Sequence, residues 1–159
     1  MPPVQGIPLV MTQDCEGLRM PERAPQRDAY DVDVVPADID ELGHVNNAVY
    51  LTWVQEAVLR HWRRVAPKEA VASHVWVALQ HQIRYRHPAF LDDHILVKVA
   101  LDKLAGVRAF YTTLITRGDE VLVEVQSCWC YLDAASRKPA RIALEIVRRF
   151  LPEKAADSL

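Results

Sequence analysis

A short polar segment, residues 38–47, concentrates side chains that can act on a carbonyl group. Its candidates for chemistry are two aspartates, an imidazole and two amides: Asp38, Asp40, His44, Asn46 and Asn47. A carboxylate held beside a carbonyl can activate water as a general base or attack the carbon directly. These residue types suit the hydrolysis of an activated acyl group. They are also common in loops and helix caps, so a purely structural role stays open.

The pattern after this segment predicts one long helix over residues 47–64. Its polar side chains form a single narrow stripe, made of Thr52, Gln55, Glu56, Arg60, Arg63 and Arg64. A surface helix normally has an apolar face of about 100°. This helix is apolar over much more of its circumference, so we expect other elements to wrap around it. Its N-terminus offers unpaired N–H groups and about half a unit of positive charge, which can stabilise an oxyanion.

Alternation of apolar and polar residues predicts five strands, one before the polar segment and four after the helix. The expected strands cover residues 28–34, 75–86, 95–101, 107–115 and 121–131. Turn residues separate the last four strands, which we expect to be joined mostly by hairpins. Residues 143–151 are expected to form a short amphipathic helix. This order predicts an α+β fold, with an antiparallel five-stranded sheet wrapped around one long central helix.

The chain of 159 residues fits one domain, which we place at residues 28–152. Five prolines break any regular pattern in residues 1–27, so we expect an irregular N-terminal extension there, and residues 153–159 are expected to form a C-terminal tail. The formal net charge of −2 argues against nucleic-acid binding, which relies on an excess of Lys and Arg. No apolar run approaches the ~20 residues of a membrane helix, so we expect no membrane span.

Three cysteines, Cys15, Cys128 and Cys130, are an odd and sparse set that fits a reducing compartment. Cys128 and Cys130 are two apart in an expected strand, where an ordinary disulfide is geometrically awkward. A zinc pair is the alternative, but the sequence lacks the second pair of ligands. With no secretory signal at the N-terminus, we expect a cytoplasmic protein that needs no metal and no cofactor.

Three motifs, in order and at matching spacing, resemble one enzyme family. They are Asp38-x-Asp40-x-x-Gly43-His44-Val45-Asn46-Asn47-x-x-Tyr50-x-x-Trp53-x-x-Glu56-Ala57, Tyr85-x-x-Pro88-Ala89-x-Leu91-Asp92-Asp93 and Arg137-Lys138-Pro139-x-Arg141. Over about residues 28–150 the chain is similar to the hot-dog-fold acyl thioesterases related to 4-hydroxybenzoyl-CoA thioesterase, and to the plant acyl-ACP thioesterases. The resemblance implies the hot-dog fold and hydrolysis of an acyl thioester, a reaction of lipid metabolism, to a carboxylic acid and a free thiol.

The resemblance also implies roles for single residues. Asp40 falls on the family's catalytic aspartate, which acts as nucleophile or general base. Asn47 falls where a backbone N–H at the helix start binds the thioester oxygen. In the acyl-ACP branch the equivalents of His44 and of an Asn two positions earlier take part. Leu42 stands at that earlier position here, so we expect His44 to orient water or substrate.

Other residues are expected to bind the substrate, an acyl thioester of coenzyme A or of acyl carrier protein. They are Asn46 and Tyr50 of the first motif, with Arg86, Arg137, Lys138 and Arg141. The basic residues suit the phosphates of coenzyme A, although solvated surface charges are the alternative. A second hot-dog branch uses a carboxylate within the helix, but Glu56 is expected to pair with Arg60 instead.

The family's acyl site lies at a subunit interface, which leads us to expect a homodimer or homotetramer in which the basic residues reach the partner's site. Two alternatives stay open. One is a hot-dog dehydratase or hydratase acting on acyl thioesters, and the other is a non-catalytic acyl-CoA-binding module.

Overall fold

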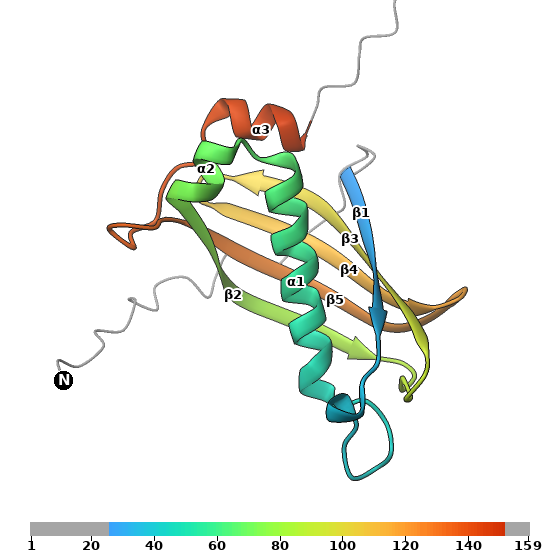
Figure 1. The fold of residues 1–159 in the computed structure, drawn as a ribbon. Helices are drawn as coiled ribbons and strands as arrows, with labels where there is room; N and C mark the ends of the chain where they lie inside the picture. The colour runs from blue at the N-terminus through green and yellow to red at the C-terminus, as the bar shows by residue number, and fades with distance from the viewer. Residues whose placement is uncertain (1–25, 152–159) are drawn as a thin grey trace, which may run out of the picture.

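The structure is a computed structural model that describes residues 26–151. Its elements are β1 (Gln26–Asp33), the 3-10 helix η1 (Pro36–Asp38), α1 (Asn47–Val65), α2 (Lys68–Ser73), β2 (His74–Tyr85), β3 (His94–Ala105), β4 (Arg108–Arg117), β5 (Glu120–Asp133) and α3 (Leu144–Phe150). The strands form one antiparallel sheet in the order β1-β3-β4-β5-β2, and α1 crosses one face of it (Figure 1). The predicted five-stranded sheet around one long helix is confirmed.

The wide apolar face of α1 holds the helix against the sheet, as its sequence predicts. Seven side chains of α1 are buried, namely Tyr50, Trp53, Val54, Ala57, Val58, His61 and Trp62. Burying one large apolar side chain stabilises a fold by about 1.5–3 kcal/mol, so this face fixes the helix on the sheet. α1 ends at Val65 because Pro67 keeps Ala66 extended, with φ −72° and ψ 152°.

Two short helices close the core at the end where α1 finishes. α3 is the helix expected after the last strand, and its Phe150 stacks on Trp62 with ring centroids 5.7 Å apart. Phe150 also meets the ring of His61 edge-on at 5.2 Å. The sequence does not predict α2, because six residues are too few to show a helical period. This helix joins α1 to β2.

The strand connections are hairpins in two places and a crossover in a third. Gly106 and Gly118 form the turns of the β3–β4 and β4–β5 hairpins, and their φ values of 62° and 58° lie in the region that favours glycine. β2 pairs with β5 at one edge, whereas β3 lies beside β1 at the other edge. Residues 86–93 therefore cross the end of the sheet, and the last four strands are joined by two hairpins and one crossover, which agrees with the expectation of mostly hairpins.

β1 begins at Gln26, two residues before the predicted boundary, because β3 is long enough to pair with Gln26 and Arg27. The rest of the expected N-terminal extension, with Cys15, lies outside the described residues, as does the expected C-terminal tail.

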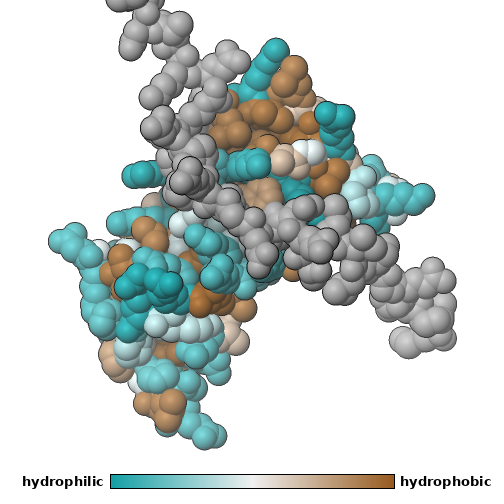
Figure 2. Space-filling model, turned by 180° about the vertical axis from the view of Figure 1, so that it is seen from behind, coloured by the Kyte–Doolittle hydropathy of each residue, from teal (hydrophilic) through white to brown (hydrophobic). Residues whose placement is uncertain are grey.

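β1 and β2 are the two edge strands, and β2 carries exposed apolar side chains. Val75 is 44% exposed and Leu79 is 49% exposed. Figure 2 shows the molecule from behind, where hydrophobic side chains gather in the upper part and hydrophilic ones predominate below. Within residues 26–151, none of the helices combines the length and apolar character that a membrane crossing demands.

Candidate active site

The loop between η1 and α1 folds back on itself and closes at the start of α1. The backbone N–H of Asp40 donates to the His44 carbonyl (2.9 Å), and the N–H of Gly43 donates to the Asp40 carbonyl (3.0 Å). Gly43 has φ 79°, which this tight turn requires and which side chains rarely adopt. A further bond, from the Asn46 N–H to the Asp38 carbonyl (2.8 Å), ties the loop to the first turn of α1.

The carboxylate of Asp40 is fixed at one oxygen and open at the other. Its Oδ1 accepts a hydrogen bond from the Leu42 N–H (2.9 Å) and lies 3.7 Å from His44 Nδ1. Its Oδ2 accepts no hydrogen bond from a described residue. The two side chains keep about a quarter of their surface exposed, 24% for Asp40 and 27% for His44. Such a carboxylate is held in place and still reachable by water.

The N-terminus of α1 supplies a donor at the same place. Asn46 is the N-cap, because its side chain accepts from the Ala48 N–H and its carbonyl accepts from the Val49 N–H, both at 2.9 Å. The Asn47 N–H has no acceptor in the part of the chain that the structure describes, and Asn47 is exposed. One helix end therefore offers a free N–H with the positive end of the helix dipole behind it.

The chain leaving β2 supports both parts of the site. Ala89, which is fully buried, accepts from the Val45 N–H (2.8 Å) and donates its own N–H to the hydroxyl of Tyr50 (2.9 Å). The hydroxyl of Tyr85 donates to the Asn47 carbonyl (3.0 Å). Tyr50 is itself buried, and burial raises its pKa, so its hydroxyl stays protonated and supports the site from beneath. Its predicted contact with substrate remains a prediction.

Tyr85 and Ala89 belong to the second sequence motif, but the motif alone does not predict a role for them in the site. The signal was present only as the spacing Tyr85-x-x-Pro88-Ala89 after a strand. What the sequence does not contain is the crossover, which brings the end of β2 against the first turn of α1.

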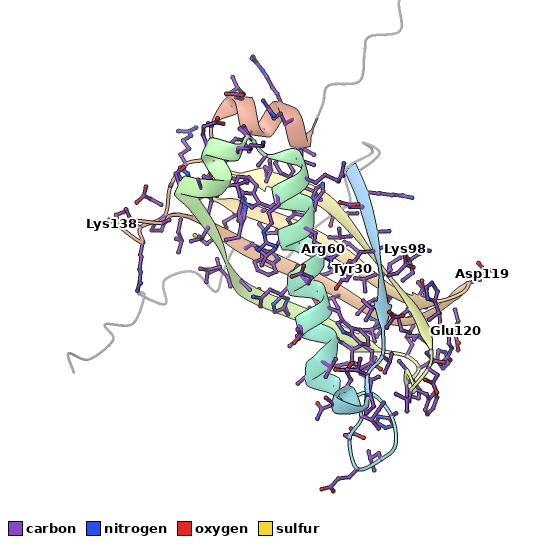
Figure 3. All side chains as sticks on the ribbon, viewed as in Figure 1. Tyr30, Arg60, Lys98, Asp119, Glu120 and Lys138 are labelled. Atoms are coloured by element: carbon purple, nitrogen blue, oxygen red, sulfur yellow. The ribbon has the colours of Figure 1, made fainter. Side chains whose placement is uncertain are left out.

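The structure brings Arg86 to this end of the molecule but does not bring the other three predicted basic residues to the site within one chain. We call Arg137, Lys138 and Arg141 the basic cluster. It follows β5, whose last residue Asp133 pairs with His74 at the start of β2, whereas Tyr85 at the other end of β2 contacts α1. β2 has twelve residues, so its two ends, His74 and Tyr85, lie roughly 36 Å apart. Figure 3 accordingly shows Lys138 far from the loop below α1.

Arg86 does lie at the site's end of the molecule, directly after β2. Its guanidinium is paired with Glu124 at 2.9 Å, and both side chains are partly exposed. Glu56 forms the expected pair with Arg60 at 2.8 Å. Cys128 and Cys130 are both buried, and burial raises the pKa of the Cys130 thiol. Among residues 26–151 no group of three or more potential metal ligands gathers.

A protein-family model described as the thioesterase-like superfamily matches residues 34–150. The chain belongs to this superfamily. The match runs from the end of β1 into α3 and includes the loop, the start of α1 and the exit of β2. It confirms the expected enzyme class, a thioester hydrolase with the hot-dog fold. No curated protein matches the chain.

Solved structures of thioesterases are similar to the chain. A thioesterase from Thermus thermophilus, complexed with coenzyme A and Zn, is 29% identical, with a TM-score of 0.69 over 77% of this chain and 95% of that one. A 1,4-dihydroxy-2-naphthoyl-CoA thioesterase from Synechocystis is 17% identical, with a TM-score of 0.69 over 80% and 98%. A probable thioesterase from Escherichia coli is 22% identical, with a TM-score of 0.65 over 77% and 98%. The last two similarities show the fold alone.

Proposed function

We propose that the protein hydrolyses an acyl thioester of coenzyme A or acyl carrier protein, with Asp40 as the catalytic carboxylate and the Asn47 N–H as the oxyanion donor. The observation that carries this proposal is the Asp40 carboxylate, anchored by the Leu42 N–H and open at Oδ2, beside the free N-terminus of α1. The thioesterase of Thermus thermophilus, which was solved with coenzyme A, supports a coenzyme A thioester as substrate.

The reaction needs only these groups and water. Asp40 takes a proton from water as the water oxygen bonds to the thioester carbon, and the carbonyl oxygen becomes an oxyanion held by the Asn47 N–H. When this intermediate collapses, the carbon–sulfur bond breaks, and the thiolate takes the proton from Asp40 and leaves as a thiol, which restores the carboxylate. Alternatively Asp40 attacks the carbon itself, the carbon–sulfur bond breaks and the thiolate leaves, and water then hydrolyses the mixed anhydride to the carboxylic acid and restores Asp40. One oxyanion donor of this kind is worth about 2.7–4 kcal/mol.

We further propose that two copies pair along β2. This edge strand has twelve residues, exposed Val75 and Leu79, and an outer edge that pairs with no strand among residues 26–151, features that favour pairing with another strand. Antiparallel pairing about a twofold axis sets the start of β2 in one copy beside its end in the other. The basic cluster of one copy then approaches the Asp40 site of the other, where it can bind the phosphates of coenzyme A.

The test is free-thiol release from short, long and aromatic acyl-CoAs by wild type and Asp40→Asn. We expect turnover to fall by at least about 100-fold in the variant, while the melting temperature and oligomeric state persist. Asp38→Asn is the matched control, because Asp38, the last residue of η1, is a nearby carboxylate whose Oδ2 accepts from the Val35 N–H (3.1 Å). Equal losses in the two variants would remove Asp40 from its proposed role.

A further inference from the structure

Two tyrosines join the exit of β2 to the first turn of α1. Tyr85 donates its hydroxyl to the Asn47 carbonyl (3.0 Å), and Tyr50 accepts the Ala89 N–H (2.9 Å). The two rings touch edge-on, with centroids 5.7 Å apart. Tyr50 is buried, whereas Tyr85 keeps 43% of its surface exposed at the end of its strand. Tyr85 therefore contributes little to the core, and its hydroxyl is committed to one helix carbonyl.

The peptide that follows Asn47 is held at both of its polar atoms. Its N–H, which belongs to Ala48, donates to the Asn46 side chain (2.9 Å), and its C=O accepts from Tyr85 (3.0 Å). The preceding N–H, that of Asn47, is the free one. Helix ends fray readily because their terminal groups lack intrahelical partners. Because the peptide between Asn47 and Ala48 is bonded at both its N–H and its C=O, the backbone of Asn47 has little freedom to rotate. The direction of the Asn47 N–H is therefore restricted.

We propose that Tyr85 is a positioning residue for thioester hydrolysis, which holds the Asn47 carbonyl and so keeps the Asn47 N–H aimed at the developing oxyanion. This inference rests on the proposed function, since it assigns a task to the N–H that the proposal uses. An oxyanion donor acts only when it is already oriented before charge develops. Small misplacement of such a group costs rate while leaving substrate binding largely intact.

Tyr30 offers a matched comparison on the same helix. Its hydroxyl donates to the Trp53 carbonyl of α1 (2.6 Å), and its ring lies under the guanidinium of Arg60 at 4.6 Å. Figure 3 shows Tyr30 at β1, beside the middle of α1 rather than its N-terminus. Tyr30→Phe and Tyr85→Phe thus remove the same kind of bond, from a tyrosine hydroxyl to a carbonyl of α1, at two different places along the helix.

The experiment measures kcat and KM for thiol release from one acyl-CoA by wild type, Tyr85→Phe and Tyr30→Phe, with melting temperatures for all three. We expect Tyr85→Phe to lower kcat by about tenfold with KM within about twofold of wild type. Tyr30→Phe should keep the wild-type kcat even where its melting temperature falls further. A purely structural tyrosine would change stability without this separation of kcat from KM.

The inference fails if both variants lower kcat alike, or if Tyr85→Phe raises KM alone. The Asp40→Asn result distinguishes this failure from that of the proposed function. If Asp40→Asn abolishes turnover and Tyr85→Phe behaves like Tyr30→Phe, the positioning role is wrong and the proposed function stands. If Asp40→Asn keeps the wild-type rate while Tyr85→Phe still loses kcat, Asp40 is wrongly assigned and the role of Tyr85 stands.

Discussion

His61 of α1 is fully buried, so a charged imidazolium at this position would be costly. Its Nδ1 lies 3.2 Å from the Tyr111 hydroxyl, and its Nε2 has no hydrogen-bond partner among the described residues. Burial lowers the pKa of His61 from 6.5 to about 4. The unfolded chain therefore binds a proton at a higher pH than the folded chain. The stability that neutral His61 contributes is complete above pH 6.5 and is lost as the pH falls toward 4.

The pKa shift sets the size of this loss. A difference of 6.5 − 4 = 2.5 units corresponds to about 3 kcal/mol in full. At pH 5 the unfolded His61 is almost wholly charged and the folded one almost wholly neutral, which gives about 2 kcal/mol relative to pH 7.5. That is a large share of the roughly 5–15 kcal/mol by which proteins are typically stable. Burial lowers the pKa of His81 as well, which steepens the same slope.

The assay is urea unfolding at pH 7.5 and pH 5, followed by tryptophan fluorescence, for wild type and His61→Leu. Other groups titrate in both proteins, so the difference between them isolates His61. We expect wild type to lose about 2 kcal/mol more than the variant between the two pH values. His61→Leu combined with Tyr111→Phe is the second variant, because it also removes the hydroxyl that leucine would leave without its present partner. Equal losses in wild type and both variants would refute the reasoning.

Two further predictions concern backbone strain and a half-buried carboxylate. Gly43→Ala and Gly118→Ala should each lower the free energy of unfolding in urea by about 1–2 kcal/mol, because both residues have a positive φ that alanine adopts only with strain. No clash adds to this cost, since no neighbouring atom lies within 4 Å of either added Cβ. Only Gly43→Ala should also slow thiol release, since its turn places Asp40; equal slowing by both would contradict this. Burial raises the pKa of Asp102, and the hydrogen bond from Thr112 (2.6 Å) offsets only part of this shift. The charged carboxylate therefore destabilises the fold at a pH above the raised pKa. Asp102→Asn should therefore stabilise the protein at pH 7.5, with a gain that shrinks as the pH falls to about 4; a gain that grows instead would show that the carboxylate is not penalised by burial.

The sequence predicts those parts of the molecule that depend on local pattern. The wide apolar face of α1 predicts a helix covered by a sheet. The prediction does not depend on which strands cover it, because so much apolar surface must be buried in any case. The loop from Asp38 to Asn46 is equally readable, since Gly43 and the Asn46 cap determine its geometry locally. Five strands follow from alternation alone, although their ends move by a few residues where pairing extends them, as at Gln26.

Relations between distant segments are what the sequence does not contain. Alternation does not distinguish a hairpin between β2 and β3 from the crossover that the structure has, because strand pairing depends on the whole sheet. The support of Asn47 by Tyr85 follows from that crossover and is unreadable for the same reason. The distance between the basic cluster and Asp40 is likewise a property of the length and direction of β2.

The strands of the sheet fall into two groups, those that pair with a neighbour in the sequence and those that pair with a distant segment. β3, β4 and β5 are joined by tight turns and can pair with little loss of chain entropy. The edge strands depend on distant partners instead, since Gln26 pairs with Leu101 and His74 with Asp133. The parts of the site come from segments next to these edge strands, and the bond from Tyr85 to Asn47 forms only when β2 and α1 are both in place. Thiol release is therefore a stringent reporter of complete folding, because a molecule that has formed its central hairpins alone has no site to work with.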